Sequence, residues 1–124
     1  MICAAALPLF AVGLCLDREP GAPWVRVQTP GQGPVFVDPT SVRAEGDEKI
    51  IRLLDTAETP ATSDIYIDLS VNCASPRRAM IVRLTEVKSG KTTEVAPANR
   101  EPADASDPFM AKLIAFVCDG TPLR

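Results

Sequence analysis

A strict alternation of apolar and polar residues between positions 64 and 73 is the feature that most limits how this chain can fold. The apolar positions are Ile65, Ile67, Leu69, Val71 and Cys73, and the polar positions are Asp64, Tyr66, Asp68, Ser70 and Asn72. Because successive side chains of a strand point to opposite faces, the alternation predicts an antiparallel strand with one face on the core and the other in water. Cys73 then lies on the buried face.

Short apolar segments separated by proline and glycine predict further strands on both sides of this one. They cover residues 24–28, 35–38, 42–43 and 49–58 before it, and 77–88 and 91–96 after it. Residues 30–34 read as the turn of a hairpin, and Asp38-Pro39 has the residue order of a type I turn. Apolar residues on both faces of the segment 49–58 indicate a central strand, which Pro60 ends.

The last element is predicted to be a helix that starts at Asp107 and ends at Gly120. Aspartate is a favoured N-cap, proline costs nothing at the first helical position, and glycine favours a left-handed end. Helical spacing places five apolar residues on one side of this helix, where they form a stripe flanked by Phe109 and Phe116. The five are Met110, Leu113, Ile114, Val117 and Cys118. Five or six strands followed by such a helix predict an α+β domain, with an antiparallel sheet covered on one face by the C-terminal helix.

Residues 1–21 are predicted to be an export signal, and residues 22–124 to be a single domain. Residues 2–16 form an apolar run of 15 residues, shorter than the roughly 20 that a membrane helix needs and typical of a signal peptide. The alternative is an N-terminal helix packed on the domain. With the signal removed, we expect no transmembrane span and a location in the periplasm, at the cell surface or outside the cell.

The chain has four cysteines, of which Cys3 and Cys15 lie in the predicted signal. The other two are Cys73, on the apolar face of a strand, and Cys118, on the stripe of the helix that must cover that face. We therefore predict a Cys73–Cys118 disulfide that ties the helix to the sheet, the alternative being two buried free thiols. Since no paired cysteine motif and no histidine is present, we expect no metal and no other cofactor.

The absence of histidine also removes the commonest general base and the usual activator of serine and cysteine nucleophiles. Asp64 and Asp68 share one strand face, but two carboxylates without a cleft are far more often solvated strand residues. We therefore expect a protein that is not an enzyme. With 13 Lys and Arg against 16 Asp and Glu and no basic run, nucleic acid is not an expected partner.

The order of these features resembles the surface-adhesin protein E-like family of small exported bacterial domains. The resemblance is carried by Trp24-Val25, by the segments VFVDPTSV at 35–42 and VNCASPRR at 71–78, and by the helix from Leu113 to Cys118. It implies an antiparallel sheet with a C-terminal helix tethered through Cys73 and Cys118. It also implies adhesion, because the family's founding member resembles an adhesin for host matrix proteins.

These observations favour an exported binding domain whose partner is an extracellular or envelope protein. Three places could supply its contact surface. They are the polar face of the strand (Tyr66, Asp68, Ser70 and Asn72), the edges of the sheet, and a basic patch formed by Arg77, Arg78, Lys88 and Lys91. For the residues of the polar face and for the basic patch, ordinary solvated surface is the more common explanation, and nothing singles out the sheet edges. Trp24 is expected in the core. The alternative function is a periplasmic ligand-binding or structural protein of the envelope, with a small apolar ligand between helix and sheet.

Overall fold

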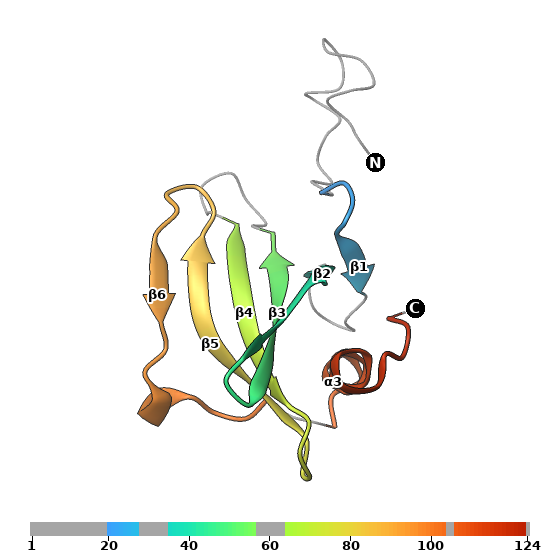
Figure 1. The fold of residues 1–124 in the computed structure, drawn as a ribbon. Coiled ribbons are helices and arrows are strands. Elements are labelled where there is room, and N and C mark those ends of the chain that lie inside the picture. The colour runs from blue at the N-terminus through green and yellow to red at the C-terminus, as the bar shows by residue number, and fades with distance from the viewer. Residues whose placement is uncertain (1–19, 28–34, 57–63, 104–105, 124) are drawn as a thin grey trace.

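The computed structural model describes residues 20–27, 35–56, 64–103 and 106–123, in which six strands form one antiparallel sheet (Figure 1). The strands are β1 (Val25–Val27), β2 (Val35–Glu45), β3 (Glu48–Asp55), β4 (Ile65–Asn72), β5 (Arg78–Glu86) and β6 (Thr92–Glu94). The short 3₁₀ helix η1 (Pro97–Asn99) and the helix α3 (Pro108–Asp119) follow. Each strand pairs with its neighbours in sequence, so the sheet is a meander. The predicted α+β fold with a C-terminal helix is confirmed.

The helix α3 has the predicted ends. Pro108 is its first residue, and the carbonyl of the preceding Asp107 accepts a hydrogen bond from the N–H of Ala111 at 2.9 Å. Gly120 ends the helix with a φ of 73°, in the left-handed region that glycine enters without steric cost. In that conformation its N–H donates to the carbonyl of Phe116 at 3.0 Å. Pro108 and Gly120 therefore act as predicted, whereas Asp107 occupies the N-cap position without a capping hydrogen bond from its side chain.

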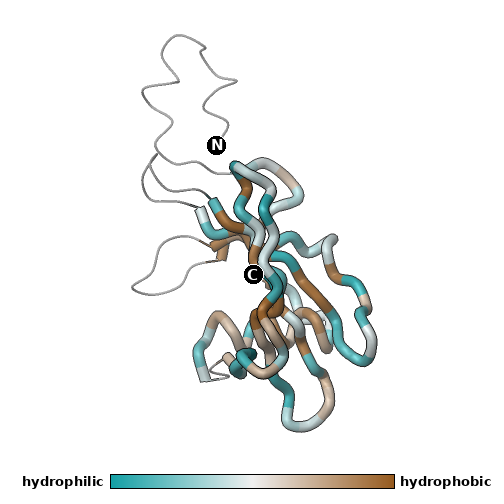
Figure 2. Tube along the Cα trace, turned by 90° about the vertical axis from the view of Figure 1, so that its left-hand side faces the viewer, coloured by the Kyte–Doolittle hydropathy of each residue, from teal (hydrophilic) through white to brown (hydrophobic). Residues whose placement is uncertain are grey.

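The main core lies between α3 and one face of the sheet. Leu113 is 0% exposed at its centre, and Leu123, beyond the helix, returns to the same core. The other buried members of this cluster are Val27, Val37, Ile51, Leu53, Leu69, Val71, Ala79, Ile114 and Val117. Hydrophobic residues, brown in Figure 2, recur along the strands, and in β4 they alternate with polar ones. This alternation gives β4 one apolar face for the helix.

The opposite face of the sheet also has a buried layer. Phe36 pairs with Leu54, and Leu54 with Tyr66, so these three side chains share the face that points away from α3. Phe36 and Leu54 are buried there, as is Ile50, which pairs with Ser70. The expectation that this face is in water is therefore wrong for the middle of β4. Asp68 is 1% exposed and Ser70 3% exposed.

The predicted turn at Asp38-Pro39 lies within β2 and does not end it. The pairing of β2 with β3 shifts register between Asp38 and Arg43. At this bulge Oδ1 of Asp38 accepts hydrogen bonds from the backbone N–H and the hydroxyl of Thr40, at 2.9 and 2.6 Å. The turn residues thus bend the strand without interrupting it. The predicted signal segment to residue 19, the turn at 30–34 and Pro60 lie outside the described residues.

Cys73 and Cys118 form the predicted disulfide, which joins the end of β4 to the last turn of α3. Their Cα atoms are 5.6 Å apart and their positions differ by 45 in sequence. One residue further on in the helix, Asp119 accepts two hydrogen bonds from Arg77, at 2.7 and 2.6 Å. The same end of the helix is thus held by a covalent bond and an ion pair.

Within the described residues, no helix combines the length and apolar character needed to cross a bilayer.

Candidate functional site

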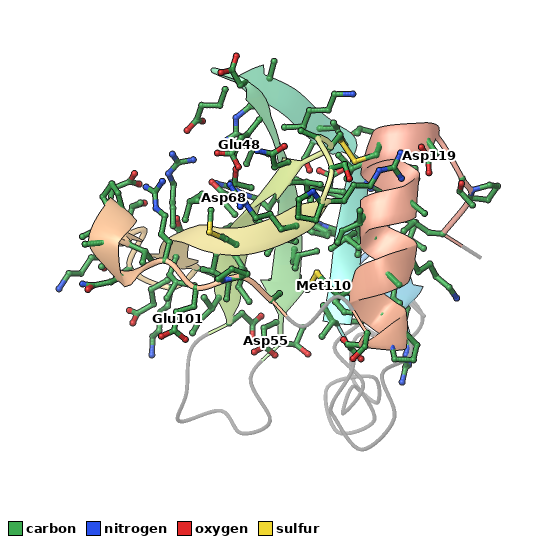
Figure 3. The ribbon with its side chains drawn as sticks, turned by 90° about the horizontal axis from the view of Figure 1, so that it is seen from below. Glu48, Asp55, Asp68, Glu101, Met110 and Asp119 are labelled. Carbon is green, nitrogen blue, oxygen red and sulfur yellow. A yellow bond between two sulfur atoms is a disulfide. The ribbon has the colours of Figure 1, made fainter. Side chains whose placement is uncertain are left out.

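The most distinctive group of side chains is a buried carboxylate beneath three arginines, here called the arginine cluster (Asp68, Arg43, Arg52 and Arg83). Asp68 lies on the side of the sheet away from α3 (Figure 3). Its register partners are Arg52 on β3 and Arg83 on β5. The carboxylate accepts hydrogen bonds from Nε and Nη2 of Arg52, Nη1 of Arg83 and Nη2 of Arg43, at 2.8, 3.3, 3.0 and 3.4 Å.

The arginines keep Asp68 ionised. Burial alone would raise the pKa of this carboxyl, because desolvation disfavours the charged form. The hydrogen bonds from Arg52 and Arg83, with the positive charge of Arg52 and Arg43, outweigh burial and hold the pKa of Asp68 below its ordinary value. A carboxylate that is ionised, buried and already accepting four hydrogen bonds is a poor general base. Its evident role is to fix the arginines in place.

Arg83 connects the cluster to β2 and to the last strand, β6. Its Nε donates to Glu94 of β6 at 2.5 Å, and its Nη2 donates to Glu45 of β2 at 3.0 Å. With Asp68 on Nη1, the guanidinium contacts three carboxylates, which raise the pKa of Arg83 above its ordinary value, Glu94 most strongly. The three positive charges of the arginine cluster are therefore matched by the three negative charges of Asp68, Glu45 and Glu94. The network is close to neutral and does not attract a free anion by excess charge.

Two aromatic rings extend the cluster along the same face. Tyr66 and Trp24 stack with ring centroids 5.9 Å apart and ring planes 6° from parallel. The guanidinium carbon of Arg52 lies 4.9 Å from the centroid of Tyr66, within cation–π range. Trp24 is half-buried and does not belong to the helix-side core, so its expected place there is wrong. We call Trp24, Tyr66, Arg52 and Arg43 the arginine–aromatic surface.

The other residues predicted for the polar face have local roles. The hydroxyl of Ser70 donates to Oε1 of Glu48 at 2.7 Å, and Oδ1 of Asn72 accepts from the N–H of Ala74 at 2.8 Å. Tyr66 and Asp68 are the two of the four that the structure brings into one group. Asp64 lies just before β4, and the carboxylate of Asp68 is occupied by arginines. The two aspartates therefore do not form a catalytic pair.

The predicted basic patch is not present. Arg77 and Arg78 lie at the start of β5, whereas Lys88 and Lys91 follow its end. At about 3.3 Å per residue, the nine residues of β5 separate the two pairs by roughly 30 Å. Arg77 is also engaged by Asp119. Four nearby positions in sequence thus lie at opposite ends of a strand.

Sequence reasoning missed the three arginines and the glutamates Glu45 and Glu94. The available signal was an arginine in each of the strands β2, β3 and β5, together with an aspartate in the middle of β4, since opposite charges pair across strands. In the described ranges, no group of three or more His, Cys, Asp or Glu side chains could hold a metal ion.

No family model, curated protein or solved structure matches this chain.

Proposed function

We propose that this chain is an exported domain that acts by binding another protein of the cell envelope or the extracellular space, as in the surface-adhesin protein E-like family. The observation that carries the proposal is the arginine–aromatic surface. The side chains of Arg43 and Arg52 are 44% and 35% exposed, beside the half-buried rings of Trp24 and Tyr66. Tryptophan, tyrosine and arginine are the residue types most enriched among those that dominate protein–protein affinity.

The rigidity of this surface supports the proposal. Arg52 is fixed from one side by Asp68 and from the other by Tyr66, which in turn stacks on Trp24. Ordering a free arginine or aromatic side chain on binding costs roughly 0.5–1.5 kcal/mol. A partner that meets side chains already held in place avoids much of that cost.

The disulfide supports export. Bonds such as Cys73–Cys118 form and persist in oxidising compartments and are rare in the reducing cytosol. The test of this part is the intact mass, with and without thiol alkylation, of the protein recovered from fractions of its native host. We expect a chain that has lost an N-terminal fragment and carries no alkylatable thiol. A full-length cytosolic chain with four free thiols would overturn export.

Binding is tested by site-specific photo-crosslinking in the same host. A photoreactive amino acid replaces Arg43, at the margin of the arginine–aromatic surface, and in a matched control it replaces the exposed Lys112 of α3. We expect a discrete protein adduct from position 43 that is lost when Trp24→Ala is added, and none from position 112. The same adducts from both positions, or none from position 43, would contradict the proposal.

A further inference from the structure

Positive and negative charges are matched unevenly within the arginine cluster. Within the described residues, every hydrogen bond from the side chains of Arg43 and Arg52 goes to Asp68. Arg83 contacts the same carboxylate but is also hydrogen-bonded to two glutamates. Arg43 and Arg52 therefore set two positive charges against one shared, buried negative charge.

Both of these guanidinium groups keep donors for a further acceptor. Arg52 uses Nε and Nη2 on Asp68, at 2.8 and 3.3 Å, so both hydrogens of Nη1 and the second hydrogen of Nη2 bond no other described residue. Nη2 of Arg43 contacts the same oxygen, Oδ2 of Asp68, so the two guanidinium groups lie side by side. Since Asp68 is buried and both arginines are half-exposed, these remaining donors face solvent.

The carboxylates that flank these donors are engaged elsewhere. Asp38 is the register partner of Arg52 on β2, and its Oδ1 accepts two hydrogen bonds from the residue two positions later. Glu45 accepts from Arg83 at 3.0 Å and lies 3.8 Å from Nη2 of Arg43, beyond hydrogen-bond distance. Among the described residues, Asp68 is thus the acceptor that Arg52 has, and it lies on the buried side.

We propose that the partner of the arginine–aromatic surface is a protein segment that places an aspartate or glutamate carboxylate on the outward donors of Arg52, beside Arg43. This inference rests on the proposed function and names the chemistry of the partner. A carboxylate matches a guanidinium fork with two parallel, charge-assisted hydrogen bonds. Because the whole network is close to neutral, the acid needs to arrive on a segment that also covers Trp24 and Tyr66. We therefore expect an aromatic or large apolar residue next to it.

The probe is a phage-displayed library of random twelve-residue peptides, selected on the oxidised wild-type protein. We expect the selected peptides to share an aspartate or glutamate beside an aromatic or large apolar residue. In the strongest binder, replacing that acid by its amide should lower the affinity at least tenfold. Selected peptides without a shared acid, an amide form that binds equally well, or a library without binders would overturn the proposal.

A double-mutant cycle assigns the contact to Arg52. Arg52→Lys keeps a positive charge on Asp68 but loses the fork, so replacing the peptide's acid by its amide should cost at least threefold less in this variant than in wild type. Each comparison uses one protein with two peptides, so a change in the stability of the variant cancels. An equal cost in both proteins would overturn the contact.

Glu45→Gln tests the same contact with the opposite sign. It removes a negative charge beside Arg43 and should raise the affinity for the acidic peptide about two- to threefold, leaving that for the amide form unchanged. The matched control is Lys112→Gln on α3, which should change neither affinity. A weaker acidic peptide in Glu45→Gln would contradict the proposal.

The crosslinks from position 43 test the surface itself. Their capture is covalent, so it does not require the contribution of Arg43 to the affinity. Crosslinks obtained together with peptides that lack a shared acid would leave the proposed function in place and remove this inference. The absence of crosslinks would remove both.

Discussion

Nε of Arg52 lies 2.8 Å from Oδ1 of Asp68, a carboxylate that is buried between β3 and β5 and that Arg43 and Arg83 also contact. This one side chain therefore organises guanidinium groups from three different strands. The arginines reach solvent at their outer sides, so the network is a buried anion with half-exposed cations. Removing the anion leaves three arginines to repel one another above an apolar layer.

We expect Asp68→Ala to lower the free energy of unfolding by about 2–4 kcal/mol, because breaking a buried ion pair from one side leaves its partners uncompensated. The half-exposed arginines can recover some hydration, which keeps the loss below the largest values known for such pairs. Urea denaturation of wild type and variant measures it. Asp47→Ala, in the exposed turn between β2 and β3, is the control and should change stability by less than about 0.5 kcal/mol. Equal effects of the two substitutions would contradict this account of Asp68.

The same carboxylate should make stability depend on pH. The pKa of Asp68 is lower in the folded protein than its ordinary value of about 3.9. Its contribution is therefore complete above that ordinary value and is lost as the pH falls through the lower folded pKa. Because Arg77 also lowers the pKa of Asp119, the comparison is made in the Asp119→Asn background. Between pH 7 and pH 2.5, the free energy of unfolding should fall less steeply for the Asp68→Asn/Asp119→Asn double variant than for Asp119→Asn alone. Parallel curves for the two proteins would refute this role of Asp68.

Loss of the disulfide should have a large effect on thermal stability. Cys73 and Cys118 close a loop of 45 positions, for which loop-closure entropy gives about 4 kcal/mol. We expect Cys118→Ser to lower the Tm by roughly 15 °C or more. Calorimetry of the oxidised wild type, the reduced wild type and the Cys73→Ser/Cys118→Ser variant checks this. The Tm of the reduced wild type should equal that of the double variant, and a reducing agent should not change the Tm of the double variant.

The packing of α3 gives a prediction that does not depend on charge. Leu113 is fully buried at the centre of the helix-side core, so Leu113→Ala should cost about 2–5 kcal/mol through lost burial and the cavity left behind. Lys112→Ala, on the exposed side of the same helical turn, is the matched control. Chemical denaturation of both variants measures the difference. A small effect at Leu113 would mean that the helix does not close the core.

The sequence predicted those parts of the fold that depend on local pattern. The alternation from Ile65 to Cys73 indicated β4, and Pro108 and Gly120 marked the ends of α3, because each signal acts on its own stretch of backbone. The burial of Asp68 could not be predicted in this way. It depends on which long side chains lie on the neighbouring strands, and the alternation that identifies a strand does not tell a solvated aspartate from one covered by arginines.

Two other errors have the same origin. Asp38-Pro39 has the residue order of a turn, but β2 pairs with β3 on both sides of it. The turn residues therefore form a bulge within β2. The four basic residues predicted to form a patch are close in sequence, yet Arg77 and Arg78 lie at one end of the extended strand β5 and Lys88 and Lys91 follow its other end. In each case the deciding information is the partner strand, which the local sequence does not contain.

The position of Leu123 has a consequence for when the protein can become folded. Val27 near one end of the described chain and Leu123 at the other belong to the same core cluster, and α3 between them supplies Leu113 and Val117. A nascent chain in which α3 and Leu123 have not yet emerged exposes the helix-side face of its sheet to water. The stable domain therefore forms only after α3 and Leu123 have been synthesised, and until then the strands made earlier lack a closed helix-side core.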